Sequence, residues 1–207
     1  MKSEIPVNLV YEDTLSFAVL RKLLDCSGQK YSIGTTYHAR GYGQIYKKIK
    51  GFNNAAKGMP YLVLTDLDKY RCSPELIKDW FGAVTIHPNL IFRIAVYEVE
   101  SWILAGGRTL AHFLGIQESA IPEDTDTIKD PKSFLLTLAS KSRKGDLKKD
   151  ILPRKGSTAK VGPDYNGRMI QYVQNMWDPQ EARVHSESLD RMMWVVNTFQ
   201  PIYERNG

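Results

Sequence analysis

The sequence predicts an α/β domain with a largely parallel central sheet. Three apolar segments, residues 6–13, 61–68 and 90–100, have the length and the β-branched or aromatic content of strands. Apolar residues at helical spacing follow each of them. Strands that alternate with helices in this way form βαβ units, whose strands lie parallel in one sheet.

The first half of the chain supplies these elements in order. After the strand at residues 6–13, apolar side chains at helical spacing over residues 15–24 predict a helix that ends before Gly28. Residues 31–37 are expected to form an edge strand. Residues 43–56, "GQIYKKIKGFNNAA", are expected to form a helix with a basic face.

The two later strands also lead into helices. Ser73 is a suitable N-cap after the strand at 61–68, and Pro74 suits the first helical position. Helical material follows the strand at 90–100 and extends to residue 116. The sheet and its helices therefore occupy the first 116 residues.

The composition changes after this point. The next residues are polar and rich in lysine, with a short amphipathic helix over 132–139 and an expected loop over 140–165. Residues 166–203 have the pattern of two helices. We therefore expect an α/β core over 1–116 and, over 117–207, a basic loop and a helical C-terminal extension packed on that core.

Composition limits the functional classes. The 207 residues carry a formal net charge of +5, which is compatible with a phosphate-rich partner but does not require one. Cys26 and Cys72 have no metal-ligand spacing and form no disulfide framework. The first residues include acids where a signal peptide needs an apolar core, and no apolar run is long enough to cross a bilayer. A cytoplasmic protein without a membrane partner is expected.

Acidic residues close all three core strands: Glu12 and Asp13, Asp66 and Asp68, Glu98 and Glu100. The carboxyl ends of parallel strands meet at one edge of a sheet, where ligands bind. Residues two apart share a face of a strand, so Asp66 and Asp68 are expected to point the same way while Leu67 faces the core. Clustered carboxylates repel one another, and a hard cation relieves that repulsion. The pattern favours a Mg²⁺ or Mn²⁺ site, although solvated strand ends are the simpler alternative.

Two motifs are similar to those of a known family. An acid after the first strand, followed later by a strand that closes on Asp-x-Asp, resembles the Toprim domain of topoisomerases, primases and nucleases of the OLD (overcoming lysogenization defect) family. Residues 95–105, "AVYEVESWILA", resemble the signature of a Toprim-like bacterial family that is often encoded beside ABC-type or AAA ATPases in anti-phage systems. The segments "DPKSFLLTL", "VGPDYN", "WDPQEAR" and "SESLDRM" extend the resemblance over nearly the whole chain.

The resemblance implies a Toprim-like, Rossmann-like fold and assigns roles. Carried over residue by residue, Glu12 acts in acid–base chemistry, Asp66 and Asp68 bind magnesium, and Glu98 or Glu100 completes the metal shell. One position departs from the family pattern: the Toprim glutamate is usually followed by glycine, whereas Asp13 follows Glu12 here.

Basic residues of the lysine-rich segment are the candidates for contact with nucleic acid. They could follow a phosphate backbone, or they could form an ordinary solvated loop. Lys160 is a candidate counter-charge for the scissile phosphate. The backbone candidates are Lys141, Arg143, Lys144, Lys148, Lys149, Arg154 and Lys155.

These observations predict a Mg²⁺-dependent nuclease that hydrolyses phosphodiesters with water as the nucleophile. The expected substrate is DNA in preference to RNA. The resemblance implies an anti-phage effector that acts with an ABC or AAA ATPase. The first alternative is a catalytically silent Toprim-like subunit that binds nucleic acid or an ATPase. A phosphatase or sugar-nucleotide transferase also uses Asp-x-Asp, but a dehalogenase-type phosphatase would carry it on the first strand, and here it follows Pro60. The sequence leaves the oligomeric state open.

Overall fold

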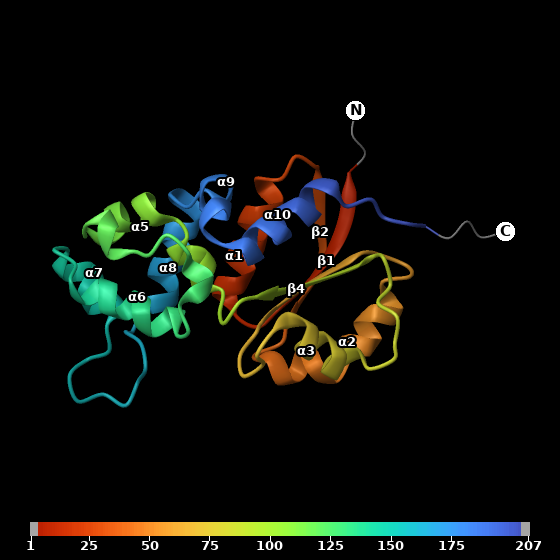
Figure 1. Ribbon diagram of the computed structural model, residues 1–207, viewed down its shortest axis with the longest axis horizontal. Helices are drawn as coiled ribbons and strands as arrows, with labels where there is room; N and C mark the ends of the chain where they lie inside the picture. Colours follow the sequence, from red (N-terminus) through yellow and green to blue (C-terminus); the bar gives the residue numbers. More distant parts are fainter. Residues whose placement is uncertain (1–3, 204–207) are drawn as a thin grey trace.

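A four-stranded sheet lies at the centre of the computed structural model, which describes residues 4–203 (Figure 1). Its strands are β1 (Ile5–Tyr11), β2 (Tyr31–His38), β3 (Tyr61–Asp66) and β4 (Leu90–Ala95). Their order is β2-β1-β3-β4, and each neighbouring pair is parallel. The predicted α/β class with a parallel sheet is confirmed, and β2 lies at the edge, as expected.

Helices cover both faces of this sheet. Helices α1 (Thr14–Asp25) and α10 (Glu187–Thr198) lie on one face, and α2 (Tyr42–Ala55) and α3 (Ser73–Phe81) lie on the other (Figure 1). The alternation of strand side chains produces these two cores. Leu9 and Leu62 point to the α1 side, whereas Val10, Val63 and Leu67 point to the α2 side. Leu67 is therefore packed, as predicted.

All three predicted core strands end earlier than the sequence predicted, and β1 ends at Tyr11, before Glu12 and Asp13. β3 ends at Asp66, and Asp68 follows in a turn with a φ of 48°. β4 ends at Ala95, so Glu98 lies in a connection, and Glu100 begins helix α4 (Glu100–Leu104). The prediction that strand geometry aligns Asp66 with Asp68 is therefore wrong, because β3 has ended before Asp68.

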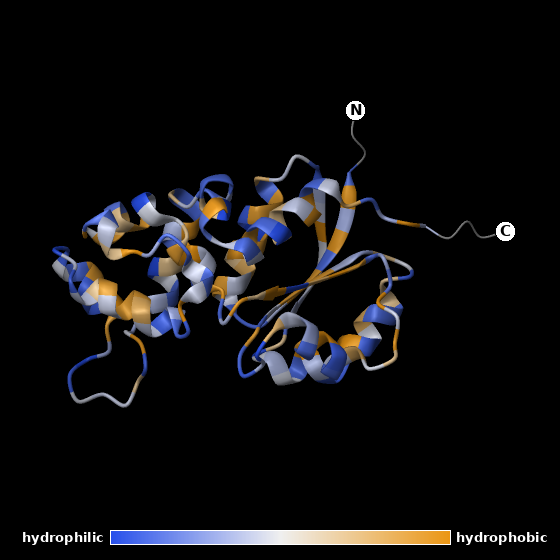
Figure 2. Cartoon of the chain, viewed as in Figure 1, coloured by the Kyte–Doolittle hydropathy of each residue, from blue (hydrophilic) through white to orange (hydrophobic). Residues whose placement is uncertain are grey.

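A helical region continues from the end of β4. It contains α4, α5 (Gly107–Leu114), α6 (Pro131–Ser140), α7 (Gly145–Ile151), α8 (Tyr165–Asn175) and α9 (Pro179–Ala182). Three 3₁₀ turns, Glu118–Ala120, Thr125–Thr127 and Arg183–His185, join these helices. The hydropathy colouring shows polar residues interleaved with apolar ones along this region (Figure 2). Its buried side chains form one continuous core with the α1 side of the sheet.

Helix α7 lies inside the stretch that was expected to be a loop. Leu147 and Ile151 are buried there, which holds this short helix against its neighbours. The expectation of a loop over residues 140–165 is therefore wrong for residues 145–151.

The end of the chain returns to the sheet. Helix α10 packs beside α1 and β4, and the residues after it run past the start of β4. There the Asn89 side chain donates from Nδ2 to the carbonyl oxygen of Ile202 (2.6 Å) and accepts from the amide of Ile202 (2.8 Å). Within residues 4–203, no helix has the length and apolar character that a membrane span requires.

Candidate active site

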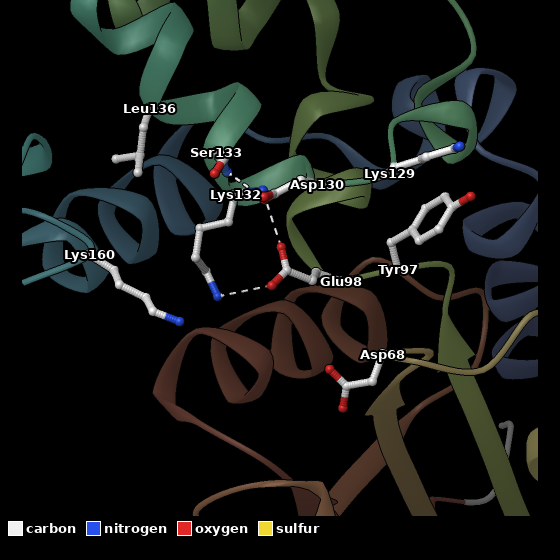
Figure 3. Close-up of a pocket in the computed structure, with 9 residues that line it drawn as sticks. All are labelled: Asp68, Tyr97, Glu98, Lys129, Asp130, Lys132, Ser133, Leu136 and Lys160. Atoms are coloured by element: carbon white, nitrogen blue, oxygen red, sulfur yellow. Dashed lines mark hydrogen bonds and ion pairs between the residues drawn. The ribbon is translucent and has the colours of Figure 1, made fainter.

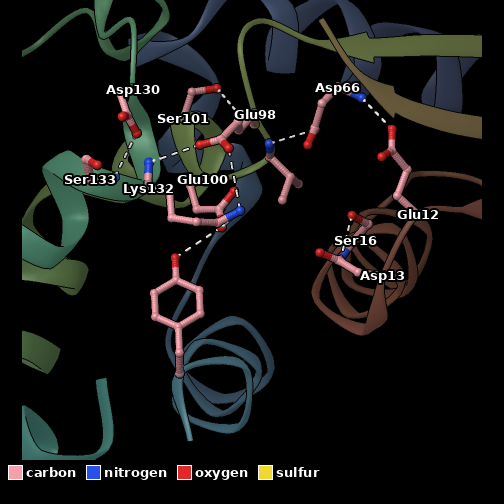
Figure 4. Close-up of polar contacts among 12 residues, drawn as sticks. Glu12, Asp13, Ser16, Asp66, Glu98, Glu100, Ser101, Asp130, Lys132 and Ser133 are labelled. Carbon is pink, nitrogen blue, oxygen red and sulfur yellow. Dashed lines mark hydrogen bonds and ion pairs between the residues drawn. The ribbon is translucent and has the colours of Figure 1, made fainter. Parts of the chain in front are cut away.

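Glu12 and Asp66 meet at the carboxyl edge of the sheet. Glu12 follows β1 and Asp66 ends β3, and these two strands are neighbours. Oε1 of Glu12 accepts a hydrogen bond from the amide of Asp66 (3.1 Å) (Figure 4) and another from Oγ1 of Thr65 (2.6 Å). Both bonds go to the same carboxylate oxygen. They fix the orientation of Glu12, and its second oxygen remains available as a ligand.

Asp66 connects this pair to the end of β4. Its Oδ1 accepts a hydrogen bond from the amide of Val99 (3.0 Å), the residue before α4 (Figure 4). Burial raises the pKa of Asp66 well above its ordinary value, and the negative charges of Glu12 and Glu100 raise it further. Burial also raises the pKa of Glu12, against the hydrogen bonds that lower it. The carboxyl groups of these acids are therefore largely buried and close enough to interact electrostatically.

Asp13 caps the N-terminus of helix α1. Its Oδ1 accepts from the amide of Ser16 (2.8 Å) and from the Ser16 hydroxyl (2.9 Å), so it is the N-cap of α1. A glycine at this position would lack that cap. The aspartate after Glu12 is thus explained by how α1 begins.

Asp68 lies on a turn that is held against the connection after β4. Its amide donates to the carbonyl oxygen of Tyr97 (3.3 Å), and both residues adopt a positive φ, 48° for Asp68 and 60° for Tyr97. The Asp68 residue is exposed, and burial of its carboxyl group followed by the charge of Glu98 raises its pKa. This turn presents Asp68 to a cavity instead of directing it along the strand.

Glu98 and Glu100 are held together by a lysine of α6. Nζ of Lys132 lies 3.2 Å from Oε1 of Glu100 and 3.5 Å from Oε1 of Glu98, and its amide donates to Oε2 of Glu98 (3.1 Å). The Tyr165 hydroxyl of α8 donates to Oε1 of Glu100 (3.1 Å). Burial alone would lower the pKa of Lys132, but the charges of Glu100 and Glu98 outweigh it and raise that pKa. The two glutamates thus have a cation of the protein itself as partner (Figure 4).

The five predicted metal ligands therefore fall into two groups. Within residues 4–203, Glu98 and Glu100 form ion pairs with Lys132, whereas Glu12, Asp66 and Asp68 form no ion pair with a lysine. The charges of Lys132 and Lys69 nevertheless act on Asp68 and lower its pKa. Among residues 4–203, no three His, Cys, Asp or Glu side chains are already arranged as a metal site. The chemistry of Glu12, Asp66 and Asp68 fits a hard cation, since their donors are carboxylate oxygens. Burial raises the pKa of all three, and neighbouring carboxylates add to this effect.

Two of these acids, Asp68 and Glu98, line a cavity of about 640 Å³. Lys132 is bonded to Glu98 there, and Lys160 extends toward the space between Lys132 and Asp68, whereas the ammonium group of Lys129 points away from both acids (Figure 3). Such a cavity can receive a phosphate group between cationic side chains and carboxylates that hold a cation. Its lining residues are Asp68, Tyr97, Glu98, Lys129, Asp130, Lys132, Ser133, Leu136 and Lys160.

The structure separates Lys160 from the other predicted basic residues. Lys160 lines the cavity of the acids. Lys144 instead donates from Nζ to the carbonyl oxygens of His112 and Phe113 (2.9 Å each), at the end of α5, and Lys149 pairs with Asp146 (3.4 Å). The rest of the predicted set lies away from this cavity lining: Lys141, Arg143, Lys148, Arg154 and Lys155.

Sequence reasoning missed the roles of Lys132 and Tyr165. Both lie in segments whose resemblance was noted without a role, "DPKSFLLTL" and "VGPDYN". Comparisons with family models, with curated proteins and with solved structures find no match to this chain.

Proposed function

We propose that the protein is a Mg²⁺-dependent hydrolase of nucleic-acid phosphodiesters, of the Toprim-like kind. The observation that carries this proposal is the contact of Glu12 with Asp66 at the carboxyl edge of a parallel sheet, beside Asp68 and a lysine-lined cavity. Ligands of open α/β sheets bind at this edge. We propose DNA as the preferred substrate. The motif resemblance supports the further proposal of an anti-phage role together with an ABC or AAA ATPase.

Each side chain then has a defined task. Glu12, Asp66 and Asp68 would hold the cation, which when bound supplies charge neutralisation at the phosphate and an acidified water. The hydrogen bonds from Thr65 and Val99 orient Glu12 and Asp66 before substrate arrives. Lys160 lines the cavity and would bind the phosphate oxygens. Lys132 fixes Glu98 and Glu100 and so sets the position of the cavity wall.

A specific observation also favours the silent-subunit alternative. The ammonium group of Lys132 already compensates Glu98 and Glu100, so these acids need no metal to remain charged. A protein with this arrangement could bind nucleic acid or an ATPase without cleaving it. Cleavage by the purified chain separates the two functions.

The test is incubation of supercoiled plasmid and of a structured RNA with Mg²⁺ and the wild-type chain, Asp66→Ala or Asp146→Ala. Asp146 is the matched control, since its side chain is 90% exposed on α7. Wild type and the control are expected to nick the plasmid, and Asp66→Ala to lose this activity while it stays folded by circular dichroism. Equal cleavage by all three proteins would reject the proposed site. Phosphate release from p-nitrophenyl phosphate without plasmid cleavage would favour a phosphatase.

A further inference from the structure

The basic excess of the chain is concentrated in one segment. Residues 26–65 contain six Lys or Arg and no Asp or Glu, whereas the whole chain has 28 basic and 23 acidic residues. The remaining residues therefore carry nearly equal numbers of both charges. In the fold, this segment forms β2, α2 and β3.

The exposed side of α2 combines these charges with aromatic rings. Tyr42 and Tyr46 are 37% and 44% exposed and lie four residues apart, so they occupy one stripe of the helix. Lys47 and Lys50 are exposed beside them, and Arg40 precedes the helix with a φ of 56°. We call Arg40, Tyr42, Tyr46, Lys47 and Lys50 the α2 surface. No carboxylate lies on this helix.

The α2 surface begins next to the candidate active site. The amide of Ala39 donates to the carbonyl oxygen of Tyr11 (2.8 Å), the residue before Glu12. The His38 ring stacks on the Tyr11 ring, with centroids 5.4 Å apart. The chain therefore passes from the acid edge into Arg40 and α2 without an intervening element, and α2 then runs beside α3 on one face of the sheet (Figure 1).

Packing holds one of the two exposed rings in place. The Tyr46 ring meets the buried Trp80 ring of α3 edge-on, with centroids 5.7 Å apart. An exposed ring that is fixed in this way loses little side-chain entropy when a flat partner stacks on it. Binding by electrostatic attraction alone would not require exposed aromatic rings.

We propose that the α2 surface binds an unpaired stretch of nucleic acid on its way to the acid edge. Phosphates would contact Arg40, Lys47 and Lys50, and bases would stack on Tyr42 and Tyr46. A duplex hides its base faces within the stack, so this surface favours a single strand. This inference rests on the proposed function, because it names single-stranded nucleic acid as the form of the substrate that the protein binds. Binding can still be measured without cleavage, so the two proposals are tested separately.

The charge pattern favours this surface over residues 141–160. In that segment Lys144 is bonded to carbonyl oxygens of α5 and Lys149 to Asp146. Asp150 is also present there and pairs with Arg168 (2.6 Å). Cations that already have protein partners release fewer counterions on binding a phosphate backbone.

The test measures binding of fluorescently labelled single-stranded oligonucleotides, DNA and RNA, by anisotropy in EDTA at several salt concentrations. Lys47→Ala/Lys50→Ala is compared with Arg154→Ala/Lys155→Ala, which removes the same charge from exposed positions of residues 141–160. Tyr42→Ala is compared with Trp194→Ala, since Trp194 is an aromatic residue of α10 that is 62% exposed on the other side of the sheet.

The lysine pair on α2 is expected to lower the slope of log affinity against log salt by about 1.4, the value for two phosphate contacts of a single strand. Tyr42→Ala is expected to weaken binding about fivefold or more with an unchanged slope. Both controls are expected to bind as wild type does, and a duplex of equal length or polyglutamate is expected to bind more weakly. Absence of binding by wild type, equal loss in a control, or preference for the duplex or polyglutamate overturns the inference. If wild type binds single strands but does not cleave plasmid, the proposed function is rejected and the binding inference stands.

Discussion

At the residue scale, the raised pKa of Asp66 makes the candidate site a source of instability. Burial is the first cause, and the charges of Glu12 and Glu100 add to it. A carboxyl group whose pKa rises on folding binds its proton more tightly in the native state than in the unfolded state. The stability of the metal-free protein is therefore expected to fall as the pH rises from about 4, the ordinary pKa of an aspartate, toward the raised pKa of Asp66.

Asp66→Asn tests this at one side chain. Asparagine keeps an oxygen that can accept from the amide of Val99 but removes the charge. The variant is expected to unfold a few degrees higher than wild type at pH 7.5 in EDTA, where each 1 kcal/mol of stability corresponds to about 2–4 °C. The gain should disappear toward pH 4. Thermal unfolding over this pH range measures it, with the exposed Asp146→Asn as control. A variant less stable than wild type at pH 7.5 would contradict this explanation.

Lys132 has the opposite effect on stability. Its ammonium group lies 3.2 Å from a carboxylate oxygen of Glu100, a residue whose side chain is 2% exposed. Lys132→Met would leave that buried charge without its cation, which we expect to cost on the order of 2–3 kcal/mol, below the usual ~3–5 kcal/mol because the lysine itself is partly exposed. Urea unfolding measures this cost.

A second substitution makes the cause of that loss specific. Lys132→Met combined with Glu100→Gln is expected to recover most of the lost stability, since the buried charge is then gone. Lys129→Met removes a lysine that also lines the cavity and is expected to be close to neutral. Equal stability of Lys132→Met and wild type would show that the Lys132–Glu100 contact contributes little.

At the scale of elements, the join between α4 and α5 depends on a glycine. A Cβ at Gly106 would lie 2.0 Å from the Tyr172 hydroxyl oxygen, 3.0 Å from Cδ1 of Trp177 and 3.1 Å from the carbonyl oxygen of Ile103. The Tyr172 hydroxyl is itself 2.8 Å from Oγ1 of Thr109, so it is not free to move away. Helix α8, which carries Tyr172, therefore packs against the α4–α5 join through this one position.

Gly106→Ala is expected to destabilise the protein by about 1–3 kcal/mol, the usual cost of overpacking a core. Gly51→Ala is the control, because Gly51 lies within α2 and a Cβ there meets nothing within 4 Å. That substitution is expected to stabilise the protein by about 0.5–1 kcal/mol. Urea unfolding measures the free energy of unfolding of both variants. If Gly106→Ala leaves it unchanged, the predicted steric clash at Gly106 is wrong.

At the scale of the whole molecule, the parallel sheet and the meeting of Glu12 with Asp66 were predictable from the sequence. Both follow from local rules: alternating strands and helices define the sheet, and the carboxyl ends of parallel strands share one edge. The positions of Asp68 and Glu98 were not predictable in this way. Asp68 and Tyr97 adopt a positive φ because two turns from separate parts of the chain bond to each other.

The ion pairs of Glu98 and Glu100 lay beyond sequence reasoning for a similar reason. Lys132 is more than thirty residues away from both glutamates, and its contact with them exists only because α6 packs beside α4. Helix α7 was missed since its support comes from buried Leu147 and Ile151 and not from a long apolar pattern. Tertiary packing decided each of these features.

Calorimetric titration of the purified chain with Mg²⁺, and with Mn²⁺, tests the central claim most directly. The claim is that Glu12, Asp66 and Asp68 together bind a divalent cation. Wild type and Asp146→Asn are expected to show saturable uptake, and Asp66→Asn is expected to lose it. Absence of uptake by wild type, or equal uptake by Asp66→Asn, would contradict the claim.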